Sequence, residues 1–125
     1  MVENSPVAID LRREAPRAPQ RQLGGLAVAA RVLDKCRAEQ AGANGEYHYN
    51  CPLDRLFFTA SGLKAENFSA MVATGADDAA AADWIRREAK AGVVRRSIWN
   101  VLATIHPGFL IMLLDDWMHA RRTHD

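Results

Sequence analysis

The stretch LAVAARVLDKCR, residues 26–37, decides the fold class of this chain. Its apolar side chains recur at intervals of three and four residues, at Leu26, Ala29, Ala30, Leu33 and Cys36. This spacing places them on one face of an α-helix and predicts a helix from about residue 25 to residue 41. Gly42 and the Asn44-Gly45 pair tolerate positive φ angles and are expected to end this helix.

Helical patterns continue along the rest of the chain. Further helices are expected to start at Pro52, Lys64, Asp77 and Ser97, and the first three of these to end at Gly62, Gly75 and Gly92. Pro107 interrupts the pattern, so a last helix is expected from about residue 108 to residue 121. Within this helical part, residues 46–49 alone could form a short extended piece. The sequence therefore predicts an all-α single compact domain of about five to six short helices.

Residues 1–22 differ from this helical pattern. They contain Pro6, Pro16 and Pro19, four arginines and few apolar residues, which is typical of an extended and partly disordered arm. The helical domain is expected to occupy residues 23–125. A chain of 125 residues, 49% hydrophobic and 25% charged, can bury a core of its own without a disulfide or a metal.

Composition also narrows the classes of function. The net charge of +1 argues against a dedicated nucleic-acid-binding protein, which usually carries a clear basic excess. The two cysteines suit an intracellular protein with free thiols. The longest apolar run, residues 109–114, is too short to span a bilayer, and the first residues lack the apolar core of a signal peptide. We expect a cytoplasmic protein without membrane contact.

The block GEYHYNCPLD, residues 45–54, lies between two apolar helical patterns. Ten residues here carry two carboxylates, two phenols, an imidazole, an amide and a thiol. Polar side chains this varied are costly to bring together unless they hydrogen-bond one another or contact a ligand. We therefore expect the functional site in this block, although it could also be a tightly braced structural loop.

Four residues of this block are candidate catalytic groups. Cys51 precedes a predicted helix start, where the helix dipole favours a thiolate nucleophile, although the nearby Asp54 carboxylate opposes it. A structural, buried Cys51 is the favoured alternative. His48 suits proton transfer near neutral pH, and Glu46 and Asp54 could form an acid and base pair at a distance that their spacing does not fix.

The candidate binding residues flank these groups. Tyr47 and Tyr49 would face the same way in an extended loop, although buried phenols usually anchor loops through their hydroxyls. Asn50 is the remaining binding candidate of the block. Asp34 and Lys35 could anchor this loop or a ligand by charge-assisted hydrogen bonds. The favoured alternative for Asp34, Lys35 and Arg37 is a solvated helix face with weak ion pairs.

Two other classes of site are not favoured by the sequence. His48 and Cys51 have the spacing of half a zinc site, but no second pair of ligands is visible, so we expect no metal and no cofactor. The basic residues between 86 and 96 could form a phosphate-contacting edge, but a solvated face is favoured there and nucleic-acid binding is not expected. Near the end of the chain, His119 can meet Asp115 or Asp116, and capping electrostatics is the simpler explanation.

Several blocks of the chain together resemble a known family. They are LGGL at 23–26, RVLDK at 31–35, GEY at 45–47, YNCPLD at 49–54, Phe57 and Gly62, with PRAP at 16–19, Trp84 and Trp99-Asn100 in support. Over most of residues 8–100 the chain is similar to the small bacterial family catalogued as domain of unknown function 5069. The resemblance implies no activity, cofactor or site residue. After Asn100 the chain departs from the family pattern.

The leading hypothesis from the sequence is a small-molecule binding protein or a cofactor-independent acid/base enzyme of the isomerase, lyase or cyclase type. Its site would be the loop Glu46–Asp54, with Asp34 and Lys35 as its floor. The alternative is a helical interaction module or homo-oligomer. A homodimer would then form through the helix at 109–118, because its run 109–114 is apolar on too many sides for a half-exposed helix.

Overall fold

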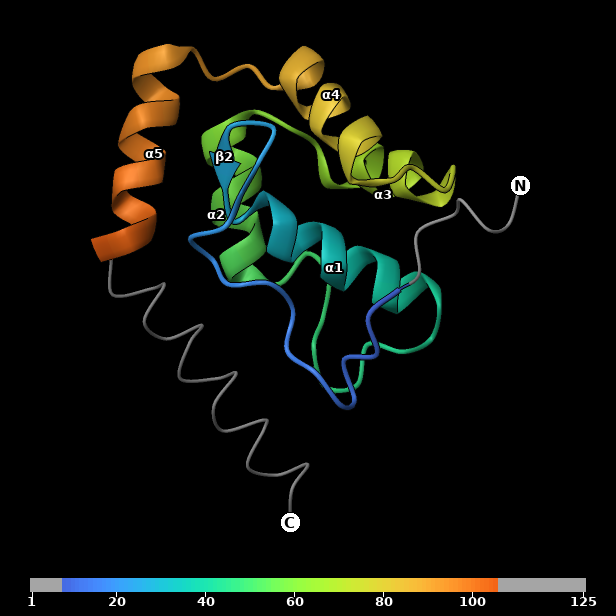
Figure 1. Ribbon diagram of the computed structural model, residues 1–125. Coiled ribbons are helices and arrows are strands. Elements are labelled where there is room, and N and C mark those ends of the chain that lie inside the picture. Colours follow the sequence, from blue (N-terminus) through green and yellow to red (C-terminus); the bar gives the residue numbers. More distant parts are fainter. Residues whose placement is uncertain (1–7, 106–125) are drawn as a thin grey trace.

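Helix α1 (Ala29–Gln40) lies at the centre of the molecule and is surrounded by the other elements (Figure 1). The computed structural model describes residues 8–105. Nine of the twelve residues of α1 are buried, and three of these, Arg31, Asp34 and Lys35, are charged. A helix that is buried on nearly every side must find partners for such charges inside the protein. The surrounding elements supply those partners.

The described residues form a mostly helical single domain with one short hairpin. The other helices are α2 (Pro52–Ser61), α3 (Ala65–Ala73), α4 (Asp78–Glu88) and α5 (Val93–Ile105). Strands β1 (Gln22–Leu23) and β2 (Leu26–Ala27) pair antiparallel, with Leu23 opposite Leu26. Helix α5 stands at the left-hand edge of Figure 1, beside β2 and α2. The predicted all-α fold class is confirmed.

Several predicted helix boundaries are confirmed. Pro52 occupies the first turn of α2, and Gly62 ends that helix with a φ of 76°. Lys64 precedes α3, and Leu63 and Phe68, on either side of the helix start, are both buried. Asp77 caps α4 because its carboxylate accepts a hydrogen bond of 2.8 Å from the backbone N–H of Ala80. These boundaries rest on local chemistry that is visible in the sequence.

Other boundaries were predicted wrongly. The first helix begins at Ala29 and not near residue 25, because Gly24 and Gly25 form the turn of the hairpin and Val28 takes a φ of 74°. Residues 46–49 form no strand, and Glu46 and Tyr49 lie in turns. Helix α4 ends at Glu88, before Gly92. Helix α5 starts at Val93, so Ser97 lies inside it and donates a side-chain hydrogen bond to Val93 O. The helix expected after Pro107 lies outside the described residues.

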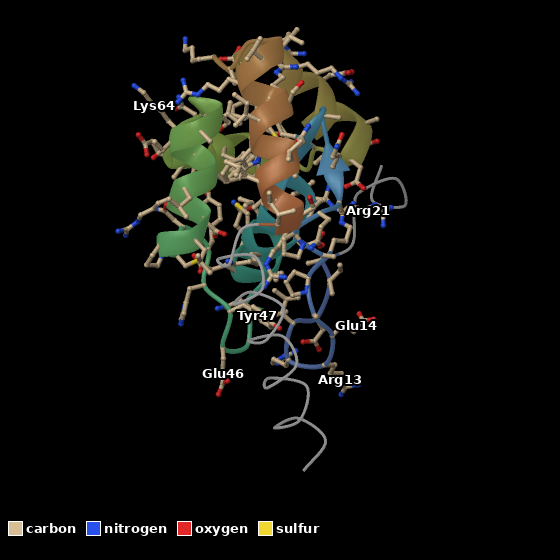
Figure 2. All side chains as sticks on the ribbon, turned by 90° about the vertical axis from the view of Figure 1, so that its left-hand side faces the viewer. Arg13, Glu14, Arg21, Glu46, Tyr47 and Lys64 are labelled. Atoms are coloured by element: carbon tan, nitrogen blue, oxygen red, sulfur yellow. The ribbon has the colours of Figure 1, made fainter. Side chains whose placement is uncertain are left out.

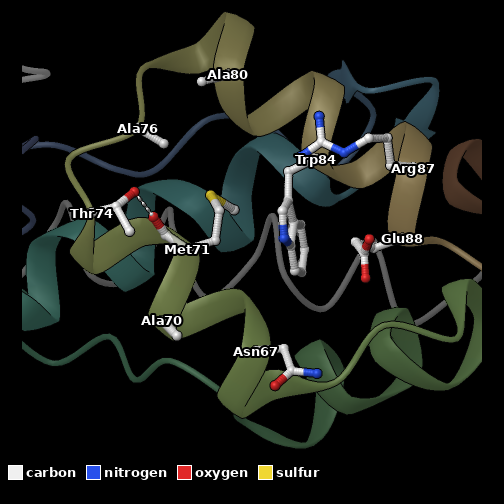
Figure 3. Close-up of a pocket in the computed structure, with 9 residues that line it drawn as sticks. All are labelled: Asn67, Ala70, Met71, Thr74, Ala76, Ala80, Trp84, Arg87 and Glu88. Atoms are coloured by element: carbon white, nitrogen blue, oxygen red, sulfur yellow. Dashed lines mark hydrogen bonds between the residues drawn. The ribbon is translucent and has the colours of Figure 1, made fainter.

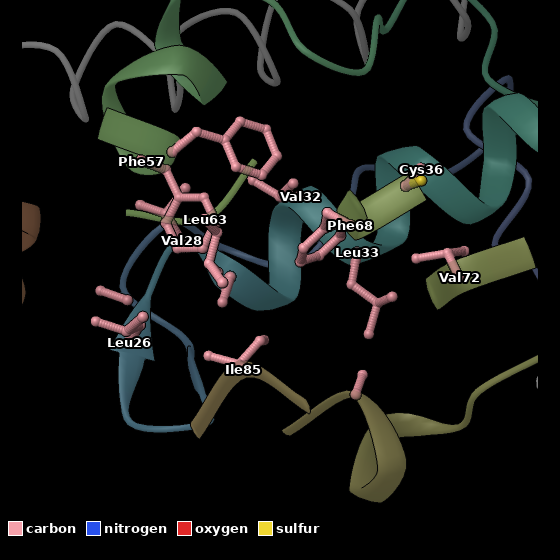
Figure 4. Close-up of a cluster of buried hydrophobic side chains, with 14 of the residues drawn as sticks. Leu26, Val28, Val32, Leu33, Cys36, Phe57, Leu63, Phe68, Val72 and Ile85 are labelled. Atoms are coloured by element: carbon pink, nitrogen blue, oxygen red, sulfur yellow. The ribbon is translucent and has the colours of Figure 1, made fainter. Parts of the chain in front are cut away.

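Aromatic side chains of α2, α3 and α4 pack together in the core. Phe57 and Phe68 are fully buried, and their rings meet edge to face at a centroid distance of 6.5 Å. Phe68 also meets Phe58 at 5.7 Å and Trp84 at 5.8 Å, both at steep interplanar angles. Figure 4 shows that β2, α1, α2, α3 and α4 all contribute side chains to this cluster. The core thus lies on the side of α1 that faces these helices.

The described part of the N-terminal arm, residues 8–21, packs against α1. Leu11 is fully buried in a small second cluster with Ala38 and Tyr47, and its backbone N–H donates a hydrogen bond of 2.8 Å to Ala43 O. The arm and the loop after α1 therefore lie together. In Figure 2, Glu46 and Tyr47 lie at the same end of the molecule as Arg13 and Glu14, away from Lys64. The arm is irregular, as expected, but it forms part of the interior.

Candidate functional site

The charged residues of α1 point in two directions. Asp34 contacts the arm, whereas Lys35 contacts the start of α2. Both side chains are almost fully buried, so the predicted solvated face is wrong for Asp34 and Lys35. The prediction exposed the charged side chains of residues 31–37 to solvent. In the structure, Asp34 and Lys35 instead lie beside residues of opposite charge. The alternative, that Lys35 anchors the loop before α2, is confirmed.

Lys35 and Asp54 form a buried ion pair that joins α1 to α2. The Lys35 Nζ lies 3.0 Å from the Asp54 carboxylate, and it also donates a hydrogen bond of 3.3 Å to Cys51 Sγ. One carboxylate oxygen of Asp54 accepts a hydrogen bond of 2.9 Å from the backbone N–H of Asn50. The Asp54 carboxylate therefore binds both the Lys35 ammonium and the backbone of the loop.

A small cavity of about 130 Å³ lies beside this pair. It is lined by side chains from three segments, which are α1, the loop after it and the first turn of α2: Arg31, Lys35, Glu46, Tyr47, His48, Cys51 and Leu53. Five of these lining residues were among the site residues predicted from the sequence. The polar block and α1 thus do enclose a hollow.

The cavity wall combines buried cations with exposed acid and base groups. Arg31 and Lys35 lie four residues apart on α1 and therefore on the same face, and both are almost fully buried. Glu46 and His48 are exposed, and Cys51 is half-buried at the N-cap of α2. The Arg31 guanidinium lies 5.9 Å from the centre of the Tyr47 ring, a cation–π distance. Buried cations and exposed acid and base groups therefore line the same cavity.

Arg31 was missed in the sequence analysis. Its position could have been predicted, because Arg31 lies four residues before Lys35 and therefore on the same helix face as this candidate site residue. Leu53 was also missed as a lining residue. It supplies an apolar side to a cavity whose other side chains are polar or aromatic.

The two tyrosines of the block have structural roles in different clusters. Tyr47 packs with Leu11 and Ala38, whereas Tyr49 packs against Phe58 and Phe68 of the main core. They do not face the same way, because the loop turns where an extended path was assumed. The Tyr49 hydroxyl donates a hydrogen bond of 2.6 Å to Ala65 O, and burial raises the pKa of this phenol. Tyr49 thus anchors the loop to α3. Of the two tyrosines, only Tyr47 lines the cavity.

Asp34 lies away from the cavity, in an ion-pair network with the arm. Its carboxylate accepts hydrogen bonds from the backbone N–H of Arg17, at 2.8 Å, and from the Arg17 guanidinium, at 2.9 Å. Arg17 also pairs with Asp78 at 2.7 Å, and Asp78 pairs with Arg37 at 2.9 Å. Burial opposes the charge of Arg17, but its hydrogen bonds to Asp34 and Asp78 raise its pKa. Asp34 therefore fastens the arm and does not form the floor of the cavity.

Comparison with models of protein families matches residues 13–102 to the family described as Domain of unknown function (DUF5069). The chain belongs to this family. The match contains the whole polar block, the helices α1 to α4 and all the residues that line the cavity, and it ends within α5. No protein of curated function is significantly similar to the chain. The geometry of the DUF5069 site is therefore the evidence for its chemistry.

A larger groove lies elsewhere on the DUF5069 fold, between α3 and α4, with a volume of about 530 Å³ (Figure 3). Trp84 points between the two helices, and Asn67, Arg87 and Glu88 surround it. These three polar side chains are exposed, and no buried ionisable group lines the groove. The smaller cavity beside Cys51 is the better candidate for a functional site because buried charged side chains line it.

The two thiols differ in their surroundings. Both cysteines are free. Cys36 is buried in the core, and burial raises its pKa to about 11. Cys51 lies at the cavity within reach of the Lys35 ammonium. Of the two thiols, only Cys51 is therefore placed to contact a ligand.

Metal ligands, membrane-spanning helices and the basic cluster are the other features of interest in the described part of the chain. Within residues 8–105 no three His, Cys, Asp or Glu side chains are arranged to hold a metal ion. None of the described helices has the length and apolar character to cross a membrane. In the basic cluster, Arg86 pairs with Asp83, while Arg95 and Arg96 donate hydrogen bonds to the backbone oxygens of Thr59 and Ala91. The candidate pairs of His119 and the dimer surface at 109–118 lie outside the described residues.

Proposed function

We propose that this chain binds a small carboxylic acid in the cavity beside Cys51 and converts it by acid/base chemistry without a cofactor. The observation that carries the proposal is the 3.3 Å contact between Lys35 Nζ and Cys51 Sγ at the wall of a cavity that Glu46 and His48 also line. An ammonium, a thiol, a carboxylate and an imidazole at one hollow are the groups that proton-transfer enzymes use.

The size of the cavity limits the ligand. Pockets for drug-sized molecules measure roughly 300–1,000 Å³, and this cavity measures about 130 Å³. It therefore suits a molecule of only a few non-hydrogen atoms. A single carboxylate with a short carbon chain fits that limit, whereas a nucleotide or a sugar chain exceeds it.

The charge of the inner wall supports a carboxylate as the group that is recognised. Arg31 and Lys35 are both almost fully buried and both line the cavity. A guanidinium presents several N–H donors in a plane, which matches the two oxygens of a carboxylate. The Lys35 ammonium has three donors, and among the described residues it donates to Asp54 and Cys51.

The outer wall would carry the reaction. In the proposed arrangement, Arg31 and Lys35 hold the carboxylate, and Cys51, His48 and Glu46 lie around the carbon beside it. One of these three groups removes a proton from that carbon, and another returns a proton to the same or a neighbouring atom. This scheme describes isomerisation; in an elimination or a ring closure the second group protonates the leaving group instead. Asp54 acts in it as a positioning residue, because its oxygens already hold Lys35 and the Asn50 backbone.

The experiment that tests binding is an NMR titration of the ¹⁵N-labelled chain with acetate, propionate and succinate, with acetamide as the uncharged control. The expected result is a saturable shift of the Cys51 and His48 backbone signals by an acid and none by acetamide. Lys35→Met is expected to weaken binding at least tenfold, while Lys64→Met, at an exposed position on the far side, leaves it unchanged. The proposal would be contradicted if acetamide caused the same shifts, or if Lys35→Met and Lys64→Met affected binding equally.

Catalysis is tested by incubating the acid that binds best with the chain in D₂O. Deuterium that appears at the carbon beside the carboxylate reports proton abstraction, whatever product the reaction forms. Cys51→Ser and His48→Gln are expected to slow this exchange at least tenfold, with unchanged circular dichroism. Glu66→Gln, an exposed change on α3, serves as the control. Exchange that persists at the wild-type rate in both cavity variants would assign the site to binding alone.

A further inference from the structure

Helix α5 presents two opposite faces. One face contacts the hairpin: the Trp99 Nε1–H donates a hydrogen bond of 2.9 Å to Ala27 O, and Asn100 Oδ1 accepts one of 2.8 Å from Ala27 N. Ala103, one turn further along, is fully buried on the same face. These three residues fix the orientation of α5. The opposite face must therefore point away from the domain.

That opposite face is apolar and exposed. The large hydrophobic residues that α5 exposes are Val93 at 81%, Val94 at 73%, Ile98 at 56%, Val101 at 59%, Leu102 at 38% and Ile105 at 71%. A helix on the surface of a globular protein normally turns its apolar stripe toward the core and its polar side chains toward water. In α5 a large apolar stripe faces outward instead. Exposed apolar patches of this kind mark sites of interaction.

The stripe has the spacing of a helix-pairing seam. Val94, Ile98, Val101 and Ile105 follow one another at intervals of four, three and four residues, which is the repeat that keeps a seam facing a partner helix. The helical period puts Arg95 at one edge of the stripe and Ser97 at the other. Charge is thus confined to the border, where Arg95 already donates a hydrogen bond to Thr59 O.

The surface of the stripe is hollowed at its centre. A shallow, open depression of about 270 Å³ is lined by Ser97, Ile98, Val101 and Leu102. A hollow on an apolar face can accept a branched aliphatic side chain of a partner, as a knob enters a hole between paired helices. Ile105 and Val94, at the two ends of the same stripe, are side chains of that kind.

We infer that the exposed face of α5 is the surface through which two copies of this chain pair. The stripe exposes on the order of 500 Å² per copy at Val94, Ile98, Val101, Leu102 and Ile105, which is most of the roughly 800 Å² that each partner buries in a standard interface. A stripe without charge is complementary to itself, because a second copy brings no like charge to its centre. A two-fold axis that crosses the stripe between its hollow and Ile105 places the hollow of each copy opposite the Ile105 end of the other.

This inference is independent of the proposed ligand site. The stripe lies on α5, and none of its residues lines the cavity beside Cys51. A failed acid titration would leave the pairing intact, and a monomeric chain would leave the ligand site intact. The two proposals therefore fail separately.

The test is the mass of the full chain in solution, measured by size-exclusion chromatography with light scattering at concentrations from low micromolar to high micromolar. The expected result is a dimer of the wild type and a monomer of the double variant Ile98→Glu with Val101→Glu. Leu56→Glu is the matched control, because Leu56 is a similarly exposed apolar residue on α2. It is expected to stay dimeric.

Two outcomes would overturn the inference. A wild type that is monomeric across the whole range means that something other than a second copy covers the face, and residues 106–125, which follow α5 directly in the chain, are then the first candidate. A dimer that survives the double variant means that the chains pair elsewhere. Should the glutamates unfold the chain, Ile98→Ala with Val101→Ala replaces them, and an increase of at least tenfold in the dissociation constant is required.

Discussion

Lys35 Nζ lies 3.0 Å from the carboxylate of Asp54, and only 5% and 0% of the two side chains are exposed. The pair connects α1 to α2 across nineteen residues of chain. Bringing two charges out of water is costly, and their mutual attraction recovers that cost only while both are present. The pair therefore makes the loop between the helices dependent on both partners at once, and this loop forms one wall of the cavity.

The first prediction concerns the stability of this pair. Asp54→Ala is expected to lower the free energy of unfolding by about 3–5 kcal/mol, because it leaves the Lys35 ammonium buried without a carboxylate. The double variant Lys35→Met with Asp54→Leu is expected to recover most of the loss. Urea denaturation at neutral pH measures both values. A double variant no more stable than Asp54→Ala would show that the ion pair itself, and not the stranded charge, provides the stability.

The second prediction concerns the arm. Arg17→Ala is expected to lower the free energy of unfolding by about 2–3 kcal/mol, because Asp34 stays buried and loses its cation. The value is below the full range for a buried pair since Arg17 is partly exposed. Arg12→Ala is the control: Arg12 pairs with Asp10 at the surface, and a change close to the error of urea denaturation is expected. Equal losses in the two variants would contradict the assigned role of Arg17.

The third prediction follows from the pKa of Asp78. The hydrogen bond from Arg17 lowers this pKa below 3.8, although partial burial opposes the shift. The unfolded chain then takes up this proton at a higher pH than the folded chain, so the stabilisation is present above pH 3.8 and is lost as the pH falls below it. Asp78→Asn should therefore reduce the loss of stability measured by urea denaturation between about pH 5 and pH 2. Asp83→Asn, at an exposed carboxylate of α4, should reduce it less.

Local chemistry explains which features could be predicted from the sequence. Pro52 at a helix start, Gly62 at a helix end and Asp77 as a cap act within one turn of the chain, and each stands where it was expected. The polar block could be identified because its side-chain variety is costly without partners. Whether this block borders a cavity or only forms a braced loop could not be predicted, and a structural Cys51 was favoured; the structure places Cys51 at a cavity.

The misplaced features depend on contacts that are distant in sequence. Asp34 was assigned to the site through its neighbour Lys35, but its partner Arg17 comes from an arm that looked unstructured. The hairpin at 22–27 was missed since its strands have two residues each, too few for an alternating pattern. The start of α5 was misplaced because Ser97 resembles a cap, yet its hydroxyl bonds to Val93 O inside the helix.

The fourth prediction concerns the turn of the hairpin. Gly24 has a φ of 63°, and a Cβ at this position would lie 2.8 Å from the Cβ of Ile85. Gly75 has a φ of 84°, with nothing within 4 Å of such a Cβ. Gly75→Ala therefore carries the cost of the left-handed conformation alone, about 1 kcal/mol, whereas Gly24→Ala adds an overpacking cost of about 1–3 kcal/mol. Thermal melts of the two variants measure the difference, and equal melting temperatures would show that the hairpin yields without cost.

The last prediction separates the two thiols. Burial raises the pKa of Cys36 to about 11, so at pH 8 only about one Cys36 side chain in a thousand is the reactive thiolate. Cys51 is half-buried at the cavity, and its sulfur lies 3.3 Å from the Lys35 ammonium. One thiol is therefore expected to react with a small disulfide reagent in the folded chain, and two in urea. In Cys51→Ser the rapid reaction should disappear and the reaction in urea should persist; rapid labelling that survives in this variant would mean that Cys36 is accessible and that the core around α1 opens in the native state.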